Sequence, residues 1–135
     1  MNYRSPGVTI VEALVAVIIV GIVATAGGPV FLRTLEIAKG SEAETTLRAI
    51  FQAERAYAFD QTPNHFGTLA DLENGRYLPG NLNTIEWTYT LTLAGSPAVT
   101  YTATATRQRG PYSEPPNNIR QMKETGVLTP SSWPP

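Results

Sequence analysis

The chain has 135 residues and a formal net charge of −1, from 10 lysines and arginines against 11 aspartates and glutamates. This length predicts one domain, and the balanced charge gives no electrostatic footprint for nucleic acid. Because the sequence contains no cysteine, it excludes disulfides, thiolate nucleophiles and cysteine-based metal sites.

A short polar leader, residues 1–7, is followed by an apolar run from Val8 to Leu32 whose single charge is Glu12. About 20 apolar residues span the hydrocarbon core of a bilayer, so this run is long enough to cross it. A carboxylate in the centre of a membrane helix costs roughly 2.5–3.5 kcal/mol on insertion scales. The sequence therefore predicts a membrane helix in which Glu12 needs a specific partner.

The N-terminal segment resembles the type IV pilin and pseudopilin family. It shares with that family a polar leader that ends in Gly7, an apolar helix and a glutamate, Glu12, five residues after the glycine. Val8-Thr9-Ile10-Val11-Glu12 stands where the family usually has Phe-Thr-Leu-Ile-Glu. The resemblance implies that a prepilin peptidase cuts between Gly7 and Val8 and methylates the new amine of Val8. It also implies that Glu12 acts in filament assembly.

Three features depart from the family pattern. Val8 replaces the usual Phe or Met, the leader has one basic residue, Arg4, where several are common, and Pro6 immediately precedes the cut. The glycine and the glutamate, which are the most specific elements of the pattern, are both present.

A mature N-terminus at Val8 would carry a positive amine, and Glu12 would lie four residues further along the same helix face. The carboxylate would also sit in the first turn, where the helix dipole favours negative charge. Glu12 can then pair with its own amine or with the amine of a neighbouring subunit. The resemblance implies the second pairing, which sets an axial register between helices.

Two other interpretations of the N-terminal segment compete with this one. An ordinary secretory signal peptide would be cut after Ala24-Thr25-Ala26, but Glu12 would interrupt its apolar core and the apolar run continues past that point. A plain single-span anchor leaves Glu12 unexplained and places Gly27, Gly28 and Pro29 inside the span.

The helix is expected to continue through residues 33–59 as an amphipathic half. Ala43, Leu47, Ile50, Glu54 and Tyr57 recur at helical spacing and form the expected buried stripe. Gly27, Gly28 and Pro29 are expected to kink or weaken the middle of the whole helix, because proline removes a backbone hydrogen bond and glycine adds flexibility.

The remainder predicts a connecting loop, residues 60–84, and an antiparallel sheet, residues 85–124. Thr68 and Asp71 have capping-box spacing and predict a short helix that ends at Asn74-Gly75. Two strands show period-two alternation with threonines on the solvent face and a hairpin at Gly95-Ser96-Pro97, and a third is expected near residues 119–123. The apolar face is expected to contain Ile85, Trp87, Tyr89, Leu91, Leu93, Val99, Tyr101, Ala103 and Ala105.

These elements predict an α+β fold, in which a long N-terminal helix packs on a small antiparallel sheet in the manner of a type IV pilin. The expected domains are the leader at 1–7, the transmembrane and assembly helix at 8–32, and a periplasmic or extracellular globular domain at 33–135, whose C-terminal tail is 125–135.

No enzyme site is predicted. His65 is the one histidine and lies in a loop rich in helix breakers, and neither a phosphate loop nor a nucleophile motif is found. Some pseudopilins hold calcium near the C-terminus, but this chain has no aspartate after Asp71, and after the predicted hairpin only Glu114 and Glu124 are acidic. We therefore expect neither a metal nor a cofactor. Trp133, between prolines, is expected to pack on the sheet or contact a neighbour.

The sequence thus predicts a structural subunit of a type IV pilus or a type II secretion pseudopilus. Its expected partners are copies of itself in a helical filament, other pilin-like subunits, the prepilin peptidase and an inner-membrane assembly platform. It would lie in the bacterial inner membrane with a cytoplasmic N-terminus, and then in a periplasmic pseudopilus or a surface pilus.

Two alternatives stay open. One is a minor pilin-like protein that binds DNA or a surface through Arg107, Arg109, Arg120 and Tyr112, although nucleic acid is an unexpected partner at this net charge. The other is a monomeric anchored or secreted domain, which requires no cut after Gly7.

Overall fold

The computed structural model describes residues 7–131, 133 and 134, with Ala26 and Gly27 described by their backbone alone. The chain divides into two compact units, Met1–Leu35 and Glu36–Pro135, which we call the N-terminal unit and the globular unit. Residues 1–6 of the expected leader and positions 132 and 135 of the expected tail lie outside the described residues.

Helix α1 runs from Ile10 to Asp60 and is 51 residues long. Its first turn is capped by Thr9, whose hydroxyl accepts a hydrogen bond from the backbone N–H of Glu12 at 3.2 Å. The helical backbone continues through Gly27, Gly28 and Pro29. By length and composition α1 can cross a membrane, and the kink at the proline stays a prediction.

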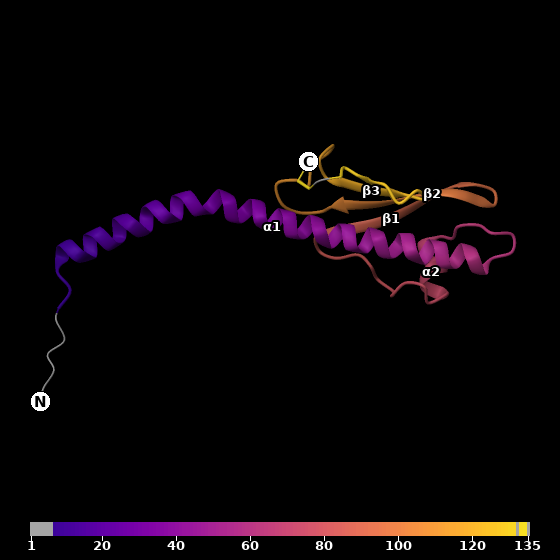
Figure 1. Cartoon of the computed structure of the whole chain (residues 1–135), viewed down its shortest axis with the longest axis horizontal. Coiled ribbons are helices and arrows are strands. Elements are labelled where there is room, and N and C mark those ends of the chain that lie inside the picture. The colour runs from indigo at the N-terminus through magenta and orange to yellow at the C-terminus, as the bar shows by residue number, and fades with distance from the viewer. Residues whose placement is uncertain (1–6, 132, 135) are drawn as a thin grey trace, which may run out of the picture. The chain divides into compact units, whose positions relative to one another are not determined.

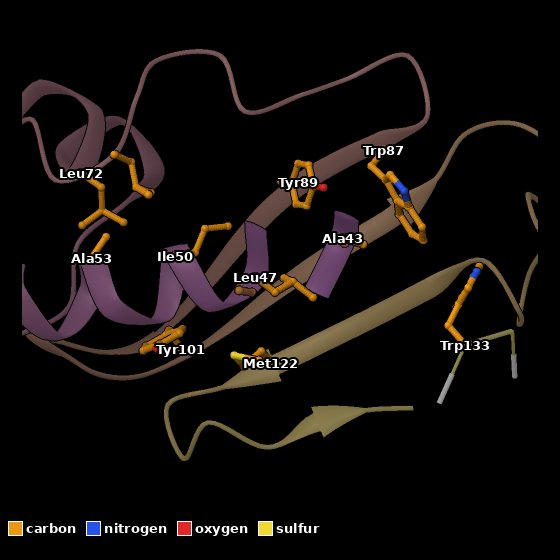
Figure 2. Packing of buried hydrophobic residues seen from close by; sticks show 13 residues of the cluster. Ala43, Leu47, Ile50, Ala53, Leu72, Trp87, Tyr89, Tyr101, Met122 and Trp133 are labelled. Atoms are coloured by element: carbon orange, nitrogen blue, oxygen red, sulfur yellow. The ribbon is translucent and has the colours of Figure 1, made fainter. Parts of the chain in front are cut away.

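The part of α1 in the globular unit buries one stripe of its surface against the sheet. Ala43, Leu47 and Ile50 are fully buried, as the helical spacing of the sequence predicts. Figure 2 shows these side chains on one face of α1, opposite Tyr101 and Met122 from the sheet. The stripe also contains Glu54, which has no exposed surface.

The connection after α1 contains helix α2, Leu69–Asn74. Thr68 and Asp71 form the predicted capping box, in which each side chain accepts the backbone N–H of the other residue. Leu72 from this helix is fully buried in the core.

The sheet has four antiparallel strands in the order β1-β2-β3-β4: Trp87–Gly95, Ala98–Arg107, Ile119–Lys123 and Leu128–Thr129. Figure 1 shows β1, β2 and β3 lying along the second half of α1. The α+β class is therefore confirmed. The sequence did not predict β4, since two residues are too few to show an alternating pattern.

Two residues of the predicted apolar face were assigned wrongly. Ile85 is 69% exposed, because β1 begins only at Trp87 and Ile85 belongs to the preceding loop. Val99 is 63% exposed, because the pairing register shifts where Gly95 pairs with Ala98 and Ala94 pairs with Thr100. The extra residue of this bulge points outward, and Ala98 takes the buried place.

Trp133 is part of the core, although prolines flank it near the end of the chain. Its side chain is nearly buried, and its ring packs edge-to-face on Trp87 with centroids 5.2 Å apart and on Tyr112 at 5.8 Å. The indole also covers Gly40 of α1, where an added Cβ would lie 2.7 Å from the Cβ of Trp133. The absence of a side chain at Gly40 thus lets the tail reach the helix.

Gly40→Ala is expected to destabilise the globular unit by about 1–3 kcal/mol, the usual cost of overpacking a core, despite the higher helix propensity of alanine. Gly28→Ala is the matched control, because nothing lies within 4 Å of a Cβ at that position. Both chains contain only Trp87 and Trp133 as tryptophans, so fluorescence-detected urea unfolding in detergent micelles reports on this unit. A Gly40→Ala midpoint equal to that of Gly28→Ala would contradict the contact.

Candidate assembly site

The large apolar side chains of the helix in the N-terminal unit are exposed. Val8 and Ile10 are 73% and 82% exposed, and the rest of the segment is similar. The large exposed apolar residues that follow are Val11, Leu14, Val15, Val17, Ile18, Ile19, Val20, Ile22, Val23, Val30, Phe31, Leu32 and Leu35. A helix that is apolar all round requires a nonaqueous environment or partner helices.

The residues of the predicted processing and assembly site lie at the start of this segment. Gly7 and Val8 precede α1, which begins at Ile10, and Glu12 lies in the first turn with an exposed side chain. Among the described residues Glu12 has no ion pair, and only its backbone N–H is bound locally, by the hydroxyl of Thr9.

Thr9 is a cap that the sequence interpretation missed. Its spacing to Glu12 is that of a capping box, Ser or Thr followed three residues later by Glu, which could have identified it. The cap fixes the start of α1 two residues after Val8.

A first charge cluster, partly buried, joins α1 to the sheet within the globular unit. It consists of Glu36, Lys39, Glu86 and Arg107. Arg107 at the end of β2 has no exposed side-chain surface and donates through Nη2 to Glu36 Oε1 at 3.1 Å. Its Nη1 binds the Glu86 carboxylate, and Lys39 Nζ lies 3.3 Å from the second oxygen of that carboxylate.

The surroundings of this cluster exclude water from the arginine. The guanidinium carbon of Arg107 lies 5.4 Å from the centre of the Trp87 ring. On another side Gly110, with a φ of +93°, comes so close that an added Cβ would lie 3.1 Å from both Arg107 and Glu36. The hydrogen bond from Arg107 is the main cause that lowers the pKa of Glu86, and Lys39 adds to it.

A second cluster lies two helical turns further along α1. Arg120 of β3 is nearly buried and donates through Nη1 to the carbonyl oxygen of Gly40 at 2.6 Å. Its Nη2 lies 3.5 Å from Glu44, which also pairs with Arg48 at 2.7 Å. The hydrogen bond from Arg48 is the main cause that lowers the pKa of Glu44.

The two clusters show that Arg107 and Arg120 do not belong to a surface patch. Both arginines are at most 2% exposed, so they cannot form the DNA- or surface-binding group considered from the sequence. Period-two spacing gave the signal that was missed, because Arg107 continues the buried column of Ala103 and Ala105, and Arg120 precedes Met122 by two residues. Glu36, Gly40 and Glu44 share one face of α1 at intervals of four residues.

Within the part of the chain that the structure describes, no cluster of three or more His, Asp or Glu side chains is placed to hold a metal ion. His65 lies edge-to-face on Tyr57, with Nδ1 2.8 Å from the carbonyl oxygen of Pro63. These contacts are local and do not assemble a catalytic group.

No protein-family model matches the chain. It is 36% identical over 56 residues to the type IV major pilin protein PilA of Myxococcus xanthus strain DK1622, a stretch that covers 42% of this chain and 26% of that protein. A solved type IV pilin from Shewanella oneidensis is 12% identical with a TM-score of 0.41, and the match covers 73% of this chain and 91% of that chain. The chain thus matches about a quarter of the length of its curated relative.

Part of the chain matches a pilin in sequence. The fold is a long helix whose first part is apolar and whose second part packs on a four-stranded antiparallel sheet. These two observations define the class, and the chain is a type IV pilin-like protein. Type IV pilins are structural proteins and not enzymes, which agrees with the class predicted from the sequence.

Arg107→Met is expected to destabilise the globular unit by about 3–5 kcal/mol, because it leaves the buried carboxylate of Glu36 without its partner. Arg109→Met is the matched control at an exposed position and should change stability by less than about 0.5 kcal/mol. Urea unfolding of both variants in micelles measures the difference, and an equal effect of the two substitutions would contradict the buried pair.

Proposed function

We propose that the chain is a structural subunit of a type IV pilus-like or type II secretion pseudopilus filament and assembles through its N-terminal helix. The observation that carries this proposal is the exposed apolar surface from Val8 to Leu35 with the single carboxylate of Glu12 in its first turn.

The exposed apolar surface of the N-terminal unit must be covered by lipid or by protein. Exposure of this surface to water costs about 25 cal/mol of free energy for each Å² of apolar area. Lipid covers it in a membrane, and the apolar helices of other copies cover it in a filament. Small residues on the helix, Ala13, Ala16 and Gly21, allow neighbouring helices to approach closely.

The carboxylate supplies the register of such an assembly. We propose that a prepilin peptidase cuts between Gly7 and Val8, that the amine of Val8 is methylated, and that this amine pairs with Glu12 of the adjacent subunit. The cost of an unpaired carboxylate in an apolar environment, roughly 2.5–3.5 kcal/mol, favours positions in which every Glu12 has a partner. A repeated head-to-tail contact builds a fibre when its rotation does not close into a ring, and this is the arrangement that we propose.

The proposed route begins in the bacterial inner membrane, with the N-terminus in the cytoplasm. An assembly platform and other pilin-like subunits would then extract the chain into a periplasmic pseudopilus or a surface pilus. Of these, the absence of cysteine favours the pseudopilus, since many adhesive pilins close a C-terminal loop with a disulfide.

Glu12→Ala should leave cleavage after Gly7 intact and reduce filament yield. Loss of an ion pair worth about 1.4 kcal/mol weakens each subunit contact about tenfold. Filaments sheared from native cells and quantified by immunoblot and electron microscopy measure the yield, and the mass of the membrane-bound chain measures cleavage.

Glu42→Ala serves as the matched control, because Glu42 is an exposed glutamate on the same helix within the globular unit. It should assemble like the native chain. Normal filaments from Glu12→Ala would contradict the proposed pairing, and an uncut native chain without filaments would favour the monomeric anchored domain.

A further inference from the structure

One carboxyl group in the globular unit is buried without a charge partner. Glu54 on α1 has no exposed surface. Its Oε2 accepts a hydrogen bond from the backbone N–H of Gly67 at 3.0 Å, and its Oε1 is buried with no hydrogen-bond partner among the described residues. Burial destabilises the ionised form of such a carboxyl, because few hydrogen bonds replace those that water would make to the carboxylate.

Gly67 belongs to the segment that connects α1 to α2, residues 61–68. The segment is closely fitted at this point, since a Cβ on Gly67 would lie 2.7 Å from the ring of Tyr57. The neighbouring Phe66 donates its backbone N–H to Ala98 at 2.9 Å and packs edge-to-face on Tyr101 with ring centroids 4.8 Å apart. The segment is therefore held by α1 on one side and by β2 on the other.

Only the backbone N–H of Gly67 favours the charged form of Glu54, and burial outweighs it. Burial is the main cause that raises its pKa to about 7, the negative charge of Asp71 on α2 raises it further, and the hydrogen bond from Gly67 opposes both. From β2 the hydroxyl of Tyr101 has a pKa raised by burial and by the charge of Glu54. Among the described residues no cation is a cause of the Glu54 shift.

We propose that Glu54 is a pH-dependent latch: its neutral carboxyl holds the connecting segment closed on α1, and its ionisation releases the segment so that water reaches the carboxylate. The hydrogen bond to Gly67 is the contact that breaks in the open form. In this proposal the rest of the globular unit stays folded, since core residues such as Leu47, Ile50 and Ala103 lie outside the connecting segment.

The direction of the pH dependence follows from linkage. A carboxyl whose pKa is raised in the closed form from its ordinary value of 4.5 to about 7 stabilises that form fully below pH 4.5. This stabilisation of the closed form is lost as the pH rises towards 7, and above that pH the equilibrium between the closed and open forms no longer changes. The equilibrium constant for opening should therefore rise on the order of a hundredfold across this range, since each pKa difference of one unit is a tenfold effect.

Hydrogen exchange of the Gly67 amide, measured by NMR on the full chain in detergent micelles, tests the latch. After division by the intrinsic exchange rate at each pH, opening at Gly67 should rise between pH 4.5 and 7 and level off above. Glu54→Gln cannot ionise and should show a flat profile. Glu42→Gln, an exposed control on the same helix, should keep the native profile.

Two further readouts distinguish a latch from a general loss of stability. The protection of Gly67 should be lower than that of the Ala103 amide on the central strand β2, since the segment opens without global unfolding. The carbon-13 shift of the Glu54 carboxyl should titrate near pH 7. A titration near 4.5, a native profile that matches Glu54→Gln, or equal protection at Gly67 and Ala103 would each overturn the proposal.

Discussion

The structure depends on one constraint: the first half of helix α1 has an almost entirely apolar surface, which must be kept away from water. Between Val8 and Leu32 the sequence is apolar apart from Glu12, two threonines and a few small residues, and the large apolar side chains of this segment are exposed. A bilayer or a bundle of identical helices can both cover such a segment. In the bundle that we propose, the amine of another subunit also neutralises the carboxylate of Glu12, whereas a helix alone in lipid offers it only the amine of its own chain.

The same helix must also present a dry face to the sheet in the globular unit, and there the solution is different. Apolar residues fill the middle of the interface, while buried arginines occupy the end of it nearer the N-terminal unit and bind Glu36, Gly40 and Glu44 of α1. Buried ion pairs add little net stability, because desolvation offsets the attraction. Their directional contacts fix which residues of the helix meet which strand, and this is the role we assign to them here.

Much of the fold follows from periodicity in the sequence. The stripe of Ala43, Leu47 and Ile50, the capping box of Thr68 and the alternation in β1 and β2 each depend on neighbours within a few residues. The predictions that were wrong depend on longer-range events: the bulge that turns Val99 outward is set by pairing across the hairpin. Period-two spacing places Arg107 in a buried column, but no local pattern shows the partners of Arg107 and Trp133, which are Glu36 and Gly40, 71 and 93 residues earlier in the chain.

The candidate assembly site is a linear segment, so the sequence alone could propose its residues, and their roles in processing and assembly stay predictions. The structure adds the cap at Thr9 and shows that the side chain of Glu12 is exposed among the described residues. The titratable groups of the globular unit act in opposite directions with pH. Glu44 and Glu86, whose pKa values are lowered by arginines, contribute stability that is lost progressively as the pH falls below 4.5, whereas the ionisation of buried Glu54 removes stability as the pH rises above that value.

The most direct test of the account is the intact mass and N-terminal sequence of the protein purified from its native membranes. The account predicts a chain that begins at Val8 and carries a methyl group on its amine, since assembly through Glu12 requires that terminus. A chain that begins after Ala26 would contradict it, because such a protein would have lost Glu12 and most of the apolar helix.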